Sequence, residues 1–333
     1  MKATRSIPAL IALTLGMSAA TEVSAKTTLR IATLAPKASS WGKVVKVWRK
    51  AVIKKSGGAL DLKVFYNAVQ GRENAMVGKM KAGQLDGALL STQGLSAINP
   101  DVRALALPGL ILDWNSLEKV RKALTPAFKK AYEEKGYILY GWSDAGLMRG
   151  FSKGVKATKP SQLSGKRVVL FNDDAMSAQA NSLIPGLVSV PLDPFETLPQ
   201  IRSGNVNYVT VPAIAAEQLQ WTPHLQYTYD RISGAATGGT LFKKAPLDAL
   251  PADVRAGFMS IATRLIPYNT KNNRAEDDAS FRRIAKKLEV VKISGADKAA
   301  WEAHDKKALK KIAQGTMPRA LVSKVAKLVG KSL

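Results

Sequence analysis

Apolar and polar residues follow strand and helix spacings along most of the chain, and their order predicts an α/β protein. Alternation over residues 28–34 predicts a short strand, and apolar residues at helical spacing over 41–55 predict the helix that follows it. A second strand at 60–66, a helix at 74–82 and a strand at 85–90 continue the pattern. This β-α-β-α-β succession is typical of a sheet with helices on both faces.

The same kind of pattern begins again in the second half of the chain. Strands are expected at 137–141, 147–152, 167–171, 187–190 and 206–211, and helices at 175–183 and 194–202. The helix-to-strand passage at 81–86 has a similar counterpart at 202–207. Chance could explain six similar residues, but the whole helix-Gly-strand-loop-helix unit recurs, which favours two similar lobes.

The last third of the chain is predicted to be mainly helical. Helices are expected at 253–265 and 269–287, a short strand at 288–293, and interrupted helix over 296–330. The length of 333 residues and the hydrophobic content of 46% suffice for two lobes with packed cores. No stretch has the composition of a disordered linker, so several segments are expected to cross between the lobes and allow a hinged cleft.

The first 25 residues have the pattern of a cleaved secretory signal peptide. Lys2 and Arg5 precede a short apolar stretch over 7–20, and residues 23–25 read Val-Ser-Ala, a small-x-small cleavage pattern. A buried N-terminal helix is the alternative interpretation of this segment. The signal peptide predicts export across the inner membrane and a location in the periplasm.

The chain is strongly basic, with 50 Lys and Arg against 25 Asp and Glu and a formal charge of +25. Export removes nucleic acid as a partner, because an exported protein does not meet the chromosome. Residues 282–333 hold 14 Lys and Arg against 4 Asp and Glu, so the excess is concentrated there. These side chains form either a solvated face or a surface that contacts anionic membrane or an acidic surface of a permease.

The sequence offers little material for catalysis or metal binding, so we expect no enzyme, no cofactor and no metal. Cysteine is absent, and histidine occurs only at His224, in a loop, and at His304, where a surface role is favoured. The glycine-containing stretch 234–239 lacks the spacing and preceding strand of a dinucleotide loop. An exported two-lobe α/β protein without catalytic machinery commonly captures a small solute between its lobes.

Several motifs, in order and spacing, resemble the solute-receptor (DctP-type) subunit of TRAP transporters. In the first half they are Ser56-Gly57-Gly58-Ala59-Leu60, Tyr66, Gly71-Arg72-Glu73, Met80 to Gly87, and Pro100 through Leu107-Pro108-Gly109-Leu110. In the second half they are Lys159 to Val169, Phe195-Glu196-Thr197-Leu198, Ser203-Gly204-Asn205-Val206-Asn207 and Leu250 to Arg255. The resemblance spans nearly the whole mature chain.

The resemblance implies a fold, a division into lobes and a partner. It implies a two-lobe, type II-like periplasmic binding protein with a hinged cleft and a long helix spanning both lobes. We expect lobe I to comprise 26–145 plus about 236–275, and lobe II to comprise 146–235 plus about 276–333. The implied partners are a small ligand and the membrane permease to which the receptor delivers it.

Two positions at which members of this family contact the ligand are valines here. The family arginine that grips the substrate carboxylate falls on Val169, and the family asparagine falls on Val211. A second family arginine has its counterpart in Arg149. We therefore expect a ligand with a substantial hydrophobic portion, whose anionic or polar end Arg149 holds. Three alternative interpretations remain open. In the first, a register change of the strand at 167–171 brings Arg167 into the cleft. In the second, Arg149 forms a structural ion pair, and in the third, Val169 and Val211 are ordinary strand core.

Further candidate ligand-binding residues lie at the carboxyl ends of predicted strands or supply apolar walls. They are Trp41, Ser91, Thr92, Gln93, Phe171, Thr210 and Trp221. Besides the receptor for a partly hydrophobic ligand, three functions remain open. They are a receptor for an ordinary small carboxylate that uses Arg149 or Arg167, a secreted enzyme that uses the same cleft, and a binding protein for envelope lipids.

Overall fold

The computed structural model describes residues 26–333, so the expected signal peptide lies outside the described part of the chain. These residues form a sheet of nine strands, in the order β2-β1-β3-β8-β4-β7-β5-β6, with β9 beside β8. The strands are β1 (Thr27–Thr33), β2 (Leu60–Phe65), β3 (Gly87–Ser91), β4 (Tyr137–Ser152), β5 (Arg167–Phe171), β6 (Val188–Leu192), β7 (Tyr208–Pro212), β8 (Tyr227–Lys243) and β9 (Glu289–Val291).

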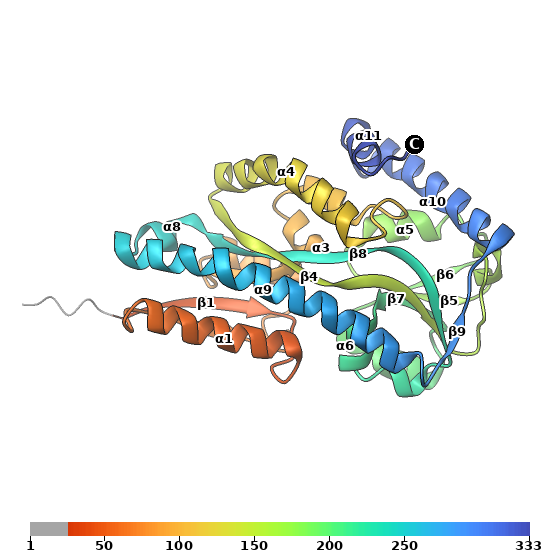
Figure 1. Ribbon diagram of the computed structural model, residues 1–333, viewed down its shortest axis with the longest axis horizontal. Coiled ribbons are helices and arrows are strands. Elements are labelled where there is room, and N and C mark those ends of the chain that lie inside the picture. Colours follow the sequence, from red (N-terminus) through yellow and green to blue (C-terminus); the bar gives the residue numbers. More distant parts are fainter. Residues whose placement is uncertain (1–25) are drawn as a thin grey trace, which may run out of the picture.

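Helices cover both faces of this sheet (Figure 1). The α-helices are α1 (Ser40–Lys55), α2 (Glu73–Lys81), α3 (Thr92–Ser96), α4 (Trp114–Glu134), α5 (Ala175–Asn181), α6 (Pro194–Ser203), α7 (Ala213–Gln218), α8 (Lys244–Asp248), α9 (Ala252–Ile284), α10 (Gly295–Gly315) and α11 (Arg319–Leu328). The 3-10 helices are η1 (Pro100–Ala106), η2 (Pro160–Leu163) and η3 (Thr222–His224). The predicted α/β class is thus confirmed.

Two long antiparallel strands, β4 and β8, join the two ends of the sheet. Their pairing runs from Tyr137 opposite Lys243 to Ser152 opposite Tyr227. At one end β8 also pairs with β3, and at the other end β4 also pairs with β7. We call the end that holds β1, β2 and β3 the first lobe, and the end that holds β5, β6 and β7 the second lobe.

The sequence pattern predicted two strands where the structure has the single strand β4. The pairing with β8 continues past a bulge between Asp144 and Gly146. Gly146 is required there, because a Cβ on it would lie 2.4 Å from the carboxyl group of Asp277. The lobe boundaries expected near residues 145 and 236 stay a prediction, and they would fall at this bulge, where Gly146 pairs with Ala236.

The partner strand β8 has no signature in the hydrophobic pattern. It contains the stretch 234–239, whose glycines carry no side chain to mark an inner and an outer face. A Cβ on Gly238 would lie 2.1 Å from the backbone oxygen of Leu90 in β3. Small residues are therefore needed where β8 passes closely beside its neighbour, and local propensity does not reveal such a strand.

Helix α9 is one continuous helix of 33 residues, although the pattern predicted two helices over the same span. Pro267 lies inside it, and the residues around it remain helical. The helix packs on α1 in the first lobe and on α7 in the second. Figure 1 shows it lying along the sheet from the region of α8 towards β9. This is the long helix that the family resemblance implied.

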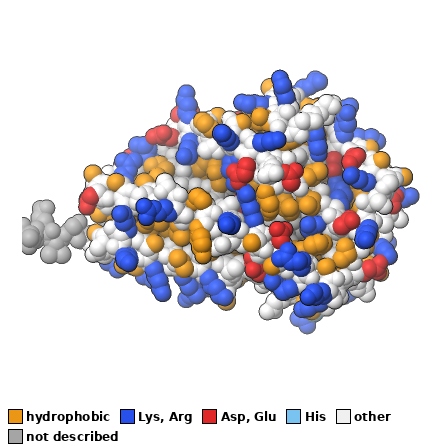
Figure 2. Space-filling model, viewed as in Figure 1, with side chains coloured by type: hydrophobic (Ala, Val, Ile, Leu, Met, Phe, Trp, Pro, Cys, Tyr) orange, Lys and Arg blue, Asp and Glu red, His pale blue; other side chains and the backbone are white. Residues whose placement is uncertain are grey.

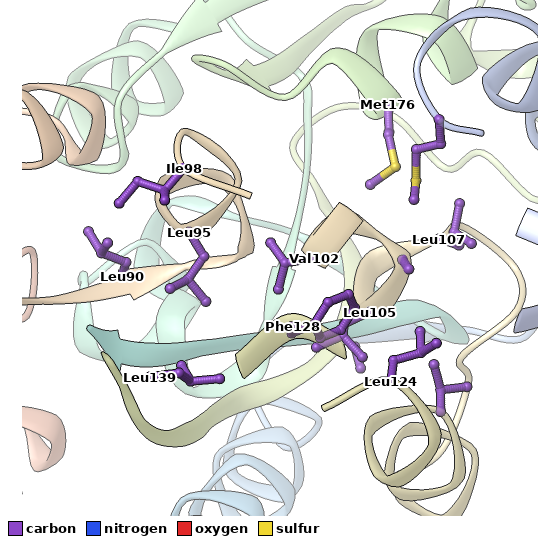
Figure 3. Packing of buried hydrophobic residues seen from close by; sticks show 14 of the residues in the cluster. Leu90, Leu95, Ile98, Val102, Leu105, Leu107, Leu124, Phe128, Leu139 and Met176 are labelled. Atoms are coloured by element: carbon purple, nitrogen blue, oxygen red, sulfur yellow. The ribbon is translucent and has the colours of Figure 1, made fainter. Parts of the chain in front are cut away.

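Each lobe has its own packed cores. In the first lobe, Leu95, Val102 and Leu105 from α3 and η1 pack with Phe128 of α4 and are nearly fully buried (Figure 3). In the second lobe, one cluster is built around Trp221, which is 1% exposed. The first of these clusters also includes Met176 of α5 and Leu309 of α10, so core packing as well as the long crossing strands joins the two ends of the sheet.

Candidate functional site

A cleft of about 990 Å³ lies between the lobes and takes side chains from both. Nine of the residues expected to bind ligand line it, and they are Trp41, Ser91, Thr92, Gln93, Val169, Phe171, Thr210, Val211 and Trp221. Its volume is at the upper end of the range of about 300–1,000 Å³ for small-molecule sites. The fold thus brings together most of the predicted positions, and their contact with a ligand stays a proposal.

The first lobe supplies a rigid polar corner where β3 meets α3. The carboxylate of Glu73 accepts hydrogen bonds from the backbone N–H groups of Ser91 (2.7 Å) and Gly94 (3.0 Å), and also from the Ser91 hydroxyl. Burial raises the pKa of Glu73, and these hydrogen bonds oppose that shift. Because an internal carboxylate already takes the free N–H groups here, the corner is poorly suited to a ligand anion.

The second lobe supplies the two valines that replace polar family positions. Val169 on β5 and Val211 on β7 are 7% and 4% exposed and belong to one packed cluster with Trp221. Both also line the cleft. They are therefore at once strand core and cleft wall, and the surface that they contribute to the cleft is apolar.

Arg149 does not line the cleft, which corrects the expectation that it holds an anionic end of the ligand. Val211, the cross-strand partner of Arg149, does line the cleft, but Arg149 itself does not. The Arg149 guanidinium instead lies 3.9 Å from the ring centroid of Phe281 on α9, and its Nη1 donates to the backbone oxygen of Asp230. Burial lowers its pKa. Arg149 thus makes structural contacts with α9 and β8.

Arg167 also lies outside the cleft. It occupies the exposed first position of β5, and its Nε donates to the backbone oxygen of Asn205. The register of β5 places Val169, two residues further along, opposite Val190 of β6. The register change that would bring Arg167 into the cleft is therefore not present.

A cluster that the sequence did not reveal comes from β8 and α10. Arg231, Trp301, His304 and Asp305 all line the cleft. His304, for which a surface role was expected, is half-buried in the cleft wall, and its ring packs edge-on against Trp301 with the centroids 5.9 Å apart. Burial, together with the charges of Arg231 and Lys307, lowers the pKa of His304 to about 4. No local signal could have found this cluster, since β8 and α10 meet only through the tertiary fold.

Two side-chain contacts bridge the lobes at the mouth of the cleft. Arg72, just before α2, pairs with Asp193, just before α6, at 2.5 Å between Nε and Oδ2. Gln218 of α7 donates its Nε2 hydrogen to the hydroxyl of Ser40 at the start of α1, over 2.7 Å. Each contact needs both lobes in their present relative position.

A buried charged network surrounds the β4 bulge between Asp144 and Gly146. The side chain of Asp144 is fully buried and accepts hydrogen bonds from Arg121 of α4, Arg274 of α9 (2.8 Å from Nε) and the Thr237 hydroxyl (2.9 Å). Asn273 donates to the backbone oxygen of Asp144 over 3.1 Å. The first-lobe helix α4 and the two long crossing elements α9 and β8 are thereby tied to one carboxylate.

A second buried carboxylate, that of Asp277 on α9, is bound in the same region. Asp277 is 2% exposed and accepts hydrogen bonds from the backbone N–H groups of Leu147 (2.9 Å) and Ile214 (3.0 Å). Burial raises its pKa, and the two hydrogen bonds oppose the shift. The helix is thus fastened both to β4 and to the start of α7.

In residues 26–333, no group of three or more acidic or histidine side chains has an arrangement that could hold a metal ion. Nor does a helix within this range combine the length and apolarity needed to cross a membrane. A hinged pair of α/β lobes around a large cleft defines the class of periplasmic binding proteins.

Comparison with known proteins places the chain within this class. Residues 31–316 match the model of the family described as bacterial extracellular solute-binding protein, family 7, and the chain belongs to that family. A solute-binding protein of Verminephrobacter eiseniae is 27% identical over 288 residues, which cover 84% of this chain and 83% of the relative. The resemblance to TRAP solute receptors seen in the sequence is thereby confirmed.

Solved structures of the same kind share the fold. A TRAP periplasmic solute-binding protein of Shewanella oneidensis with bound succinate gives a TM-score of 0.83 at 15% identity, over 92% of this chain and all of that chain. An extracytoplasmic solute receptor of Bordetella pertussis that binds pyroglutamic acid gives a TM-score of 0.82 at 17% identity, over 92% of this chain and all of that chain. The predicted two-lobe binding-protein fold is therefore confirmed.

Proposed function

We propose that this protein is the periplasmic receptor of a TRAP-type transporter, that it captures a small ligand with a hydrophobic portion in the cleft, and that it delivers the ligand to a membrane permease. The presence of Val169 and Val211 in the cleft wall is the observation that supports a hydrophobic portion in the ligand. The family membership supports a receptor rather than an enzyme. Export by the signal peptide at 1–25 is part of the proposal.

Burial of apolar ligand surface against these walls would contribute favourably to binding. Apolar surface contributes about 25 cal/mol per Å² buried, so roughly 200 Å² of ligand surface would contribute about 5 kcal/mol. The lining includes Trp41 and Phe171, whose half-buried rings offer apolar faces. A ligand that contacts both lobes also favours their present arrangement over a separated one, which is how binding would close the receptor.

A receptor for an ordinary small carboxylate is the second candidate. It is favoured by the bound succinate and pyroglutamic acid of structurally similar proteins. Against it, the arginines expected to serve such a ligand, Arg149 and Arg167, lie outside the cleft. The two candidates differ in the amount of apolar surface that the ligand buries.

Identification of the natural ligand tests this function directly. The protein is purified from its own host without denaturation, and native mass spectrometry with extraction identifies what co-purifies. A bound molecule with an aliphatic or aromatic body supports the proposal. A small dicarboxylate or a sugar acid contradicts the hydrophobic ligand and leaves the receptor function intact. A chemically altered product after incubation would indicate an enzyme, and a phospholipid would indicate an envelope lipid carrier.

The basic C-terminal segment is a further part of the proposal. α10 and α11 carry exposed lysines at 306, 307, 310, 311, 324 and 327. Figure 2 shows Lys and Arg side chains distributed over the face viewed, including the region of these helices. Such a surface attracts anionic lipid head groups at about 1 kcal/mol per basic residue close to the membrane. We propose that this segment makes peripheral contact with anionic membrane near the permease.

A further inference from the structure

The cleft has a charge balance opposite to that of the whole chain. Acidic side chains that line it outnumber basic ones, although the chain has twice as many Lys and Arg as Asp and Glu. Within the described residues, the basic side chains of the lining are Arg72 and Arg231. Arg72 lies at the mouth and is paired with Asp193. Arg231 is thus the cation that the interior of the cleft offers.

Arg231 is held in place but keeps free hydrogen-bond donors. Its Nη2 donates to the carboxylate of Asp305, and its Cζ lies 4.6 Å from the ring centroid of Trp301. Its side chain is 18% exposed, and in residues 26–333 neither its Nε nor its Nη1 donates to a protein acceptor. A planar guanidinium fixed on one edge and one face presents its remaining edge to a carboxylate.

The Arg231 side chain lies at the wall of an apolar chamber of the cleft. The chamber is formed where the second-lobe sheet faces α5 and α10, and its walls are Leu163, Val168, Ile184, Tyr208, Ile293 and Trp301. These residues come from six different segments and belong to one packed hydrophobic cluster. A molecule bound to Arg231 can therefore extend its apolar body along these walls.

We propose that Arg231 is the anchor for the anionic end of the ligand, and that the ligand is an amphipathic monocarboxylate whose apolar body occupies this chamber. The inference rests on the proposed receptor function and specifies its ligand class. Arg231 would supply the cationic contact that neither Val169 nor Arg149 provides. The proposal limits the ligand to one carboxylate because the cleft lining includes Glu73, Asp173 and Asp193, whose charges would repel a second one.

Calorimetric titration with octanoate, octanamide and succinate as probes tests the proposal. Wild-type protein is expected to bind octanoate more tightly than octanamide or succinate. Arg231→Gln should weaken octanoate binding about tenfold or more and change octanamide binding less than about twofold, because the charge-assisted hydrogen bonds are lost. Arg231→Lys should recover part of the affinity. Arg167→Gln removes an arginine outside the cleft and is the matched control.

A variant that keeps Arg231 separates a binding role from a structural one. Asp305→Asn removes the carboxylate that competes for Arg231, so octanoate should bind more tightly to it than to wild type. A purely structural Arg231–Asp305 pair predicts the opposite, since both variants would then lose affinity together with stability. Thermal melting of each variant shows whether it is folded under the conditions of the titration.

The outcomes distinguish the anchor from the proposed function. If octanoate binds wild type and Arg231→Gln equally well, the anchor is wrong and the hydrophobic-ligand receptor stands. If succinate binds wild type instead of octanoate, both the hydrophobic ligand and the monocarboxylate class are wrong. If Arg231→Gln then loses succinate binding, the role of Arg231 as the carboxylate anchor is still supported. If no carboxylate binds wild type at millimolar concentration, the inference is overturned.

Discussion

Arg72 and Asp193 form an ion pair across the mouth of the cleft, with Nε and Oδ2 2.5 Å apart, although 121 positions separate them in the chain. Asp193 also accepts a hydrogen bond from Asn172 over 2.7 Å, so the acceptor is fixed on the second lobe before Arg72 reaches it. The pair forms only when the two lobes approach each other. It is therefore a marker of the closed arrangement.

Loss of this pair should shift the receptor towards an open arrangement. Arg72→Ala is expected to increase the radius of gyration of the ligand-free protein in small-angle X-ray scattering and to weaken ligand binding several-fold at most, because the pair is exposed to water. Arg319→Ala, at the exposed start of α11 and away from the cleft lining, is the control. An unchanged radius of gyration together with unchanged affinity would show that the pair does not contribute to closure.

Removal of the Asp144 carboxylate should strongly destabilise the protein. Asp144→Ala leaves the guanidinium groups of Arg121 and Arg274 without their buried partner, and such a loss costs about 3–5 kcal/mol of unfolding free energy. Urea denaturation measures the effect. Glu118→Gln alters the half-exposed end of the same network and should cost less than about 1 kcal/mol. Equal effects of the two variants would contradict a central role for Asp144.

An arginine at position 169 should restore binding of small carboxylates. Val169 lines the cleft at the position where the family resemblance places the carboxylate-gripping arginine. Val169→Arg is expected to give a succinate-dependent rise in melting temperature that wild type lacks, although burial of the new charge lowers the stability of the free protein. Val188→Arg, on the exposed edge strand β6, is the control. If succinate does not change the melting temperature of Val169→Arg, the alignment of Val169 with the family arginine is wrong.

Protonation of His304 should destabilise the protein in mild acid. Burial lowers its pKa from 6.5 to about 4, so between these pH values the unfolded chain binds more protons than the folded one. Stability contributed by the neutral ring is therefore present above pH 6.5 and is lost as the pH falls towards 4. The full shift corresponds to roughly 2–3 kcal/mol, and partial exposure reduces this.

His304→Asn isolates this contribution from that of the carboxylates. Urea denaturation at several pH values between 4 and 7 should show a stability difference between wild type and His304→Asn that changes in favour of wild type as the pH rises. Other titrating groups are common to both proteins and cancel in the difference. A pH-independent difference would contradict a neutral, buried His304.

Contact of the C-terminal segment with membrane should depend on salt and on lipid charge. Binding to phosphatidylglycerol vesicles is expected at low salt and not to phosphatidylcholine vesicles, and it should weaken steeply as salt is added. Lys306→Glu together with Lys310→Glu should reduce it, while the same changes at Lys119 and Lys122 of α4 should have little effect. Failure to bind acidic vesicles at low salt would mean that the basic side chains form only a solvated face.

Local pattern was sufficient for the short elements and for most of the cleft positions. The strand at 167–171 was predicted with the bounds of β5, and nine of the ten candidate residues line the cleft, because loops at the carboxyl ends of strands meet at one edge of an α/β sheet. Helical spacing likewise located α1 and α6 to within one residue at each end. These features depend on contacts between neighbours in the chain.

The direction of Arg149, the strand β8 and the position of His304 were decided by the tertiary structure alone. β4 bulges between Asp144 and Gly146 and shifts register again around Arg149, and Asp277 of α9 occupies the space that a Cβ on Gly146 would need. Arg231 and Trp301 meet through strands and helices that are far apart in sequence. The sequence by itself thus determined the class of protein and an apolar cleft wall, whereas long-range packing decided which arginine lies inside it.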